Sequence, residues 1–139
     1  MDKFKYLLIY FLRYGYLLEL NIIMTEKIAF IGIGNMGLPM AKNLKNAGKK
    51  VKVFDVSKKM LDKAKNENLE IAENIDRLID QEISFVITML PEGKNSEEVY
   101  LGEKGIIKKV SKNCLLIDCS TIDIETSIKI GKKANEEKI

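Results

Sequence analysis

The chain of 139 residues contains no histidine and only two cysteines, and both absences restrict its chemistry. Without histidine there is no imidazole for acid–base catalysis, and most metal sites of the zinc type are excluded. Cys114 and Cys119 lie five positions apart around an apolar segment, so their side chains should point to opposite faces. We therefore expect reduced thiols in a cytoplasmic protein, with no disulfide and no bound metal.

Basic blocks, internal repeats and low-complexity segments are also missing from the sequence. The net charge is +3 with both signs interspersed, and no basic block alternates with aromatic residues, so nucleic acid is not expected as a partner. Hydrophobic residues make up 46% of the chain and charged residues 31%, with a mean hydropathy of -0.08. This composition predicts one soluble globular domain.

Residues 1–23 differ in composition from the rest, because their first sixteen positions hold six of the ten aromatic residues. A signal peptide is disfavoured, since Arg13 interrupts the apolar run and no small-residue cleavage site follows. Arg13 and Glu19 also break any membrane span, so no membrane is expected as a partner. We expect an upstream extension or a poorly ordered tail, with an interfacial helix as the alternative. The folded domain is then predicted to span residues 24–139.

The segment from Ile28 to Leu44, IAFIGIGNMGLPMAKNL, carries the most informative pattern in the chain. An apolar run predicts a buried strand, the spacing Gly32-x-Gly34-x-x-Gly37 follows it, and a helical pattern begins at once. The first glycine permits a tight turn, the second lets the backbone approach two phosphates, and the third allows close packing of helix on strand. The pattern therefore predicts a pyrophosphate-binding turn at a helix N-terminus, in preference to a loop with incidental glycines.

An acidic residue ends the next expected strand, which covers residues 50–55. Asp55 lies 18 positions beyond Gly37, about where a carboxylate meets the adenosine ribose hydroxyls. A carboxylate there would repel the 2′-phosphate of NADP, which favours NAD as the cofactor, although Lys58 and Lys59 weaken this preference.

From Met24 onward, strand and helix patterns alternate, which predicts an α/β fold with a doubly wound parallel sheet of the Rossmann type. Further strands are expected at 69–72, 83–90 and 115–119, the last two buried. The expected strand order is 3-2-1-4-5, with the nucleotide in the crevice between the first and fourth strands. Three helices are expected to begin at capping residues, namely Ser57, Asn95 or Ser96, and Asp123.

Three segments together resemble the 3-hydroxyisobutyrate dehydrogenase family of β-hydroxyacid dehydrogenases. They occur in the order and spacing of that family, over a stretch from about Ile28 to Lys138. The segments are GIGNMGLPMAKNLKNAG (32–48), ITMLP (87–91) with Asn95 and VYLG (99–102), and LIDCSTID (116–123).

The resemblance implies a role for each matching residue. The pyrophosphate turn would comprise Gly32, Gly34, Asn35, Met36 and Gly37, Asp55 would hold the adenosine ribose, and Leu90, Pro91 and Asn95 would line the crevice. Ser120 and Thr121 would lie where nicotinamide and substrate meet, Ser120 binding the substrate and Thr121 the cofactor. From spacing alone, an alternative stays open in which Pro91 ends a strand, Asn95 caps a helix, and Ser120 and Thr121 form an ordinary loop.

The resemblance also implies a reaction, the NAD-dependent oxidation of a small hydroxyacid. The favoured substrate is 3-hydroxyisobutyrate, oxidised to methylmalonate semialdehyde in valine degradation, and a related semialdehyde or glyoxylate reductase is the alternative. A 6-phosphogluconate dehydrogenase is disfavoured, because it usually carries Asn-Arg where this chain has Asp55-Val56. The family usually has proline where this chain has Ile124, which removes some preorganisation of the last helix.

Family members are longer, with a helical second domain and a catalytic lysine near the junction of the two domains. No lysine here matches the motif of that residue, so no general acid or base is assigned. We therefore expect the cofactor-binding part of the enzyme, with the helical domain absent, completed by the missing C-terminal half or by a homo-oligomer partner. The alternative is a non-catalytic NAD-binding fragment of an interrupted gene. A membrane-associated binding module is disfavoured.

Overall fold

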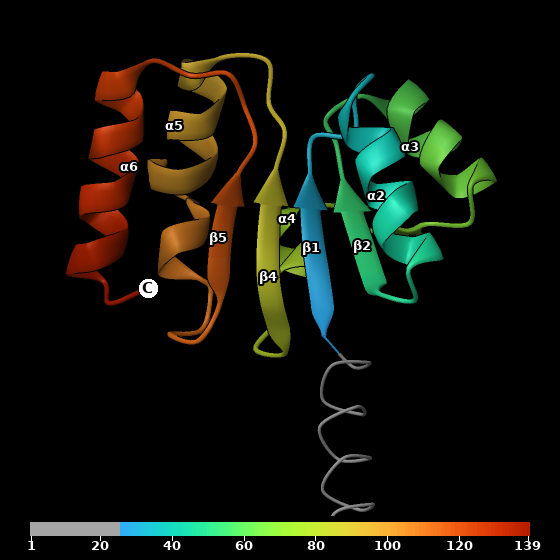
Figure 1. Ribbon diagram of the computed structural model, residues 1–139, viewed down its shortest axis with the longest axis horizontal. Helices are drawn as coiled ribbons and strands as arrows, with labels where there is room; N and C mark the ends of the chain where they lie inside the picture. Colours follow the sequence, from blue (N-terminus) through green and yellow to red (C-terminus); the bar gives the residue numbers. More distant parts are fainter. Residues whose placement is uncertain (1–25) are drawn as a thin grey trace, which may run out of the picture.

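Five parallel strands form one sheet in the order β3-β2-β1-β4-β5, which confirms the predicted strand order. The computed structural model describes residues 26–139, so the expected extension over residues 1–23 lies outside the described residues. Figure 1 shows the sheet with its strands pointing to one edge. The elements are β1 (Lys27–Ile31), α2 (Gly37–Asn46), β2 (Lys50–Phe54), α3 (Lys58–Asn66), β3 (Glu70–Ile71), α4 (Ile75–Leu78), β4 (Ile83–Thr88), α5 (Gly93–Leu101), the 3-10 helix η1 (Ile106–Lys108), β5 (Leu115–Asp118) and α6 (Ile124–Glu136).

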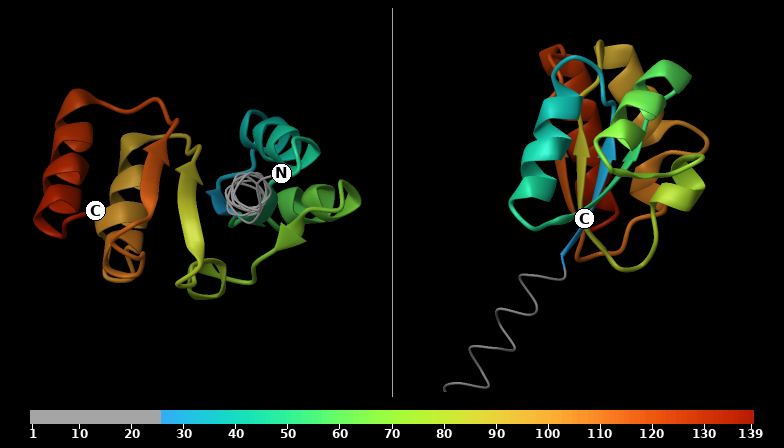
Figure 2. Two further views of the ribbon diagram at one scale, coloured as in Figure 1. Left: turned by 60° about the horizontal axis from the view of Figure 1, so that its bottom comes forward. Right: turned by 90° about the vertical axis from the view of Figure 1, so that its right-hand side faces the viewer.

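Helices cover both faces of the sheet, as expected for a doubly wound fold (Figure 2). On one face, α2 and α3 pack on β1 and β2 around the fully buried side chains of Phe30 and Val53. On the other face, α4, α5, η1 and α6 enclose a second cluster that includes Ala29, Val86 and Tyr100. Because β1 and β4 are covered on both faces, their apolar runs do not alternate with polar residues.

The strand register places the ends of four strands in one row. Ile31 pairs with Phe54 on one side and with Thr88 on the other, and Thr88 in turn pairs with Asp118. The residues that follow these strands therefore leave the sheet at the same edge, the upper edge in Figure 1. This edge is where ligands bind in open α/β sheets.

The expectation that β5 is a buried strand is wrong. The strand lies at the end of the described sheet, and Leu115 keeps 55% of its surface exposed. Leu116 packs toward α5 and α6, whereas Ile117 is only half-buried on the opposite face. An apolar strand sequence cannot reveal whether a neighbouring element covers it, because that depends on the position of the strand in the sheet.

The helices begin in two different ways, and this difference matters for the site. Asp123 caps α6, since its Oδ1 accepts a hydrogen bond from the Thr126 N–H at 2.8 Å. This contact, with a second from the Thr126 hydroxyl, holds the pKa of Asp123 below its ordinary value. No side chain caps α2, whose N-cap position is Met36. The same holds for α5, which begins at Gly93, so Asn95 or Ser96 as its cap is a wrong expectation.

Ser57 occupies the N-cap position of α3, yet its side chain makes no capping hydrogen bond. Its backbone N–H instead donates to Asp55. Within residues 26–139, no helix has the length and apolar character needed to cross a membrane.

Candidate functional site

The turn between β1 and α2 leaves no room for side chains at two of its glycines. Gly32 has a φ of +88°, and a Cβ there would lie 2.4 Å from the carbonyl oxygen of Met89. A Cβ on Gly37 would lie 1.9 Å from the carbonyl oxygen of Gly32. Gly34 differs, because a Cβ there would have no protein atom within 4 Å. The first and third glycines are thus needed for packing within the protein, and the second borders open space.

The backbone of this turn offers hydrogen-bond donors that no protein group uses. Within residues 26–139, no acceptor is found for the N–H groups of Gly34, Asn35 and Met36. No acidic side chain lies in the first turn of α2 either. Free N–H groups at the positive end of a helix dipole bind anions, and phosphate in particular. The turn therefore has the donor set that a pyrophosphate requires.

Asp55 follows β2 directly and ties the glycine turn to the next helix. Its Oδ2 accepts the Ile33 N–H at 2.8 Å, and its Oδ1 accepts the Ser57 N–H at 2.7 Å. Each carboxylate oxygen has two lone pairs, so both can still accept a hydroxyl group. Two backbone N–H groups thus fix the orientation of a side chain that retains capacity for a ligand.

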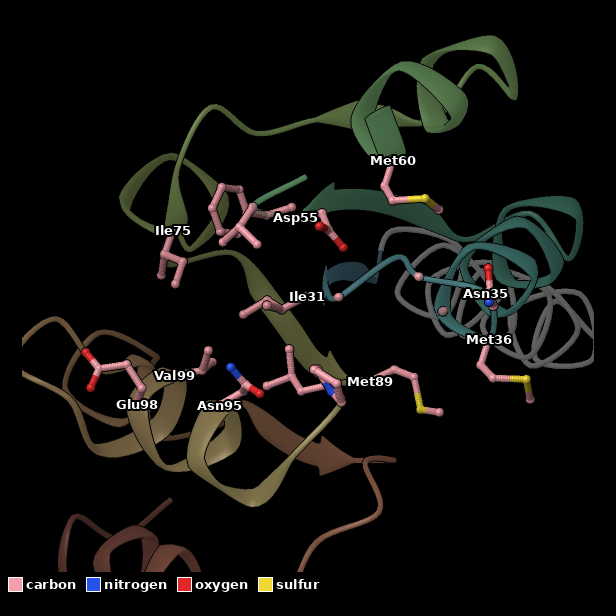
Figure 3. Close-up of a pocket in the computed structure, with 17 residues that line it drawn as sticks. Ile31, Asn35, Met36, Asp55, Met60, Ile75, Met89, Asn95, Glu98 and Val99 are labelled. Carbon is pink, nitrogen blue, oxygen red and sulfur yellow. The ribbon is translucent and has the colours of Figure 1, made fainter. Parts of the chain in front are cut away.

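A cavity of about 480 Å³ opens at this edge of the sheet. Figure 3 shows Asp55 and Met60 on one side of it and Asn95 and Val99, from α5, on the other. This size is typical of a small-molecule site. Nine of the predicted cofactor-binding residues line the cavity: Gly32, Gly34, Asn35, Met36, Gly37, Asp55, Leu90, Pro91 and Asn95.

Eight further lining residues were not predicted from the sequence: Ile31, Phe54, Val56, Met60, Ile75, Met89, Glu98 and Val99. Most are apolar, and they lie at strand ends or in the helices that follow. Val99 could have been found, because it lies one helical turn after Asn95 and shares its face. Ile75 could not have been found from the sequence, since its position at the cavity depends on how the chain crosses from β3 to β4.

Ser120 and Thr121 do not line the cavity. Ser120 is nevertheless joined to its wall, because the Leu90 N–H donates to Ser120 Oγ at 2.8 Å. Thr121 is exposed in the loop that leads to α6. The predicted pair is therefore divided, with one residue in contact with the crevice wall and the other in the solvent.

A chain of hydrogen bonds runs beneath this wall. Tyr100 OH and Thr88 Oγ1 lie 2.8 Å apart, and the Thr88 hydroxyl donates to Asp118 Oδ1 at 2.9 Å. The Ser120 N–H also donates to Asp118 Oδ1, at 2.9 Å. Burial raises the pKa of Tyr100 well above its ordinary value. These polar groups connect α5, β4, β5 and the loop at Ser120.

The buried hydroxyl of Tyr100 should make the domain sensitive to alkali. Since folding raises the pKa of Tyr100, its stabilising contribution is present below about pH 10, where an unfolded tyrosine titrates, and declines above it. When the pH is raised from neutral to about 11, the free energy of unfolding should therefore decrease less in Tyr100→Phe than in the wild type. Urea unfolding at both pH values measures this, and an identical loss in the two proteins would contradict it.

Both cysteines are free thiols, as expected, but only Cys114 is buried, and burial raises its pKa. Cys119 is exposed. In the part of the chain that the structure describes, no group of three or more histidine, cysteine, aspartate or glutamate residues could hold a metal ion.

A doubly wound parallel sheet with a glycine turn, an uncapped helix start and a carboxylate after the second strand defines a dinucleotide-binding domain of the Rossmann type. Comparison with known proteins then gives the family. The family model described as the NAD binding domain of 6-phosphogluconate dehydrogenase matches residues 27–139, and the chain belongs to this family. The expected class of cofactor, NAD, is thereby confirmed.

The resemblance to 3-hydroxyisobutyrate dehydrogenases is also confirmed. The chain is 42% identical over 111 residues to the enzyme of Pseudomonas aeruginosa and 41% identical over 116 residues to the mitochondrial enzyme of Mus musculus. These matches cover 80% and 78% of this chain, but only 37% and 32% of the relatives. A structure of the Mycobacterium tuberculosis enzyme with L-serine superposes with a TM-score of 0.74 at 30% identity, covering 81% of this chain and 38% of the other.

Proposed function

We propose that residues 26–139 bind NAD in the crevice between β1 and β4 and serve as the cofactor domain of a β-hydroxyacid dehydrogenase. The observation that carries the proposal is the glycine turn, where three unused N–H groups border the open space beside Gly34. The orientation of Asp55 supports the same conclusion, because its free lone pairs suit the two ribose hydroxyls.

Each part of the crevice then has a task. The turn from Gly32 to Gly37 holds the pyrophosphate, Asp55 holds the adenosine ribose, and Leu90, Pro91 and Asn95 form the wall beside β4. When bound, the cofactor supplies the acceptor for a hydride. Thr121 is proposed as a further contact to it, although in this structure its side chain is exposed.

Ser120 is proposed as the substrate-binding residue. Its Oγ accepts the Leu90 N–H, and its own hydroxyl proton has no acceptor within residues 26–139. That proton is therefore available to the carboxylate or the hydroxyl of a small hydroxyacid. The similarity to 3-hydroxyisobutyrate dehydrogenases supports 3-hydroxyisobutyrate as this substrate and valine degradation as its pathway. Free thiols support a cytoplasmic location.

The chain spans about a third of the length of the curated relatives that it matches. Turnover by this chain is accordingly a proposal, and NAD binding without catalysis is the second candidate, favoured because no lysine is among the described residues that line the crevice, whereas the family resemblance implies a catalytic lysine. An assay of the purified chain with NAD and 3-hydroxyisobutyrate separates the two. Production of NADH would reject the non-catalytic candidate.

The choice between NAD and NADP should depend on Asp55. Asp55→Ala removes a charge-assisted hydrogen bond to the ribose and the repulsion of a 2′-phosphate, and Lys58 and Lys59 stay nearby. We expect the ratio of NADH to NADPH affinity to fall by about tenfold or more. Titration of each cofactor, followed by its fluorescence, gives this ratio.

The ratio is used because Asp55→Ala also frees the N–H groups of Ile33 and Ser57, which weakens the turn for both cofactors alike. Asp62→Ala, at an exposed aspartate of α3, is the matched control and should leave the ratio unchanged. Equal losses for NADH and NADPH in Asp55→Ala would remove the ribose role from Asp55. A wild-type protein that binds neither cofactor would overturn the proposed function.

A further inference from the structure

Asp118, the last residue of β5, connects the sheet to the predicted substrate contact. The strand register sets it beside Thr88, the last residue of β4. Asp118 does not line the crevice. Any influence that it has on the ligand must therefore pass through its neighbours.

The hydrogen bonds of Asp118 have a fixed direction. A carboxylate oxygen can only accept, so the Thr88 hydroxyl donates to Oδ1, and the Tyr100 hydroxyl must then donate to Thr88. The same Oδ1 accepts the Ser120 N–H at 2.9 Å. One atom thus binds a buried side chain of β4 and the backbone of the loop beyond β5.

Ser120, whose backbone Asp118 holds, also contacts the wall of the crevice. Its Oγ accepts the Leu90 N–H at 2.8 Å, and Leu90 lines the cavity. The loop is also fixed one residue earlier, since the Cys119 N–H donates to the Thr88 carbonyl at 2.8 Å. With its backbone held and one lone pair of its Oγ used by the Leu90 N–H, the Ser120 hydroxyl keeps its proton and its second lone pair for a ligand.

The second oxygen of Asp118 has a less favourable environment. Oδ2 is buried and has no hydrogen-bond partner within the described residues. A buried acceptor without a partner destabilises a fold, so stability alone does not account for an aspartate here. Such departures are expected where the geometry of a site requires them.

We propose that Asp118 is a positioning residue, which holds Ser120 so that Leu90 and the Ser120 hydroxyl face the nicotinamide half of the crevice. The inference rests on the proposed function. Asp55 and the glycine turn lie on the β2 and β1 side, where the adenosine half is expected, whereas Asp118 and Ser120 lie on the β5 side. Loss of Asp118 should therefore weaken the binding of the complete dinucleotide and spare its adenosine half.

A double-mutant cycle on the full chain tests this. NADH and ADP-ribose, which lacks nicotinamide, are titrated against the wild type, Asp118→Ala, Ser120→Ala and the double variant. Each single variant should weaken NADH binding by about fivefold and change ADP-ribose binding by less than about twofold. Because Asp118 acts through Ser120, removing both side chains should cost no more NADH affinity than the more damaging of the two single substitutions. Additive losses, or equal losses for the two ligands, would overturn the inference.

Two further variants are controls that distinguish a positioning role from a loss of folding. Asp118→Asn keeps an oxygen that can accept the Ser120 N–H, so its NADH affinity should stay within about twofold of the wild type. A loss of NADH binding in this variant, with ADP-ribose binding kept, would contradict the role assigned to Oδ1. Asp123→Ala removes a neighbouring exposed carboxylate that caps α6, and should change neither affinity. A wild type that binds ADP-ribose and NADH while these patterns fail would leave the proposed function standing and reject the positioning role.

Discussion

Gly34→Ala is expected to reduce NADH affinity by at least about tenfold while the fold is kept. A Cβ at this position would meet no protein atom within 4 Å, so the folded domain can accept it without strain. The same methyl group would project into the space beside the free N–H groups of the turn, where the phosphates are proposed to bind. Cofactor fluorescence and thermal unfolding, measured on the same samples, give affinity and stability together.

Gly131→Ala is the matched control for this variant. Gly131 lies in α6 and is exposed, and a Cβ there would also meet no atom within 4 Å. Alanine there should preserve NADH binding and raise stability by about 1 kcal/mol, because glycine is a poor helix former. NADH binding that survives Gly34→Ala unchanged would show that the phosphates lie elsewhere.

Gly37→Ala should have the opposite effect and destabilise the fold itself. Its Cβ would lie 1.9 Å from the Gly32 carbonyl oxygen and 3.2 Å from the Phe30 ring. A clash with backbone cannot be relieved by rotating a side chain, so α2 must move away from β1 at a cost of about 3 kcal/mol or more. Urea unfolding would detect a loss of this size. A midpoint equal to that of the wild type would show that the turn widens freely.

The two variants together separate the tasks of one turn. If the glycines served only the bend of the chain, Gly34→Ala and Gly37→Ala would lose stability alike. The structure instead assigns stability to Gly37 and open space to Gly34, in line with the different roles that the motif predicts for its second and third glycines.

Much of the fold could be predicted because its signals are local. The alternation of strand and helix patterns predicts a parallel sheet, the glycine motif adds the strand order of the Rossmann type, and the position of Asp123 before a helix identifies it as a cap. Local signals predicted the glycine turn and Asp55, whereas Leu90, Pro91 and Asn95 came from the family resemblance; all of them line the cavity, since the carboxyl ends of parallel strands meet at one edge.

The errors arose where several elements decide the outcome. The sequence of β5 is apolar, yet its exposure depends on whether another element lies beside it. Asn95 and Ser96 are good capping residues, but α5 begins two residues before Asn95, so both fall within its first turn. Asp118 lies in the LIDCSTID segment, yet the sequence predicts no role for it, because its contacts with Thr88 and Ser120 form only in the folded chain.

The missing cap of α2 has a thermodynamic consequence. At the starts of helices α4 and α6 a side chain accepts a backbone N–H group: Asn74 accepts that of Arg77, and Asp123 accepts that of Thr126. Helix α2 lacks such a side chain, so an anionic ligand would supply acceptors that the described residues do not provide. Ligand binding and folding are then coupled, and saturation with the dinucleotide at 100 times its dissociation constant would raise the unfolding free energy by about 2.7 kcal/mol. The concentration of the cofactor in the cell would thus set part of the lifetime of the domain.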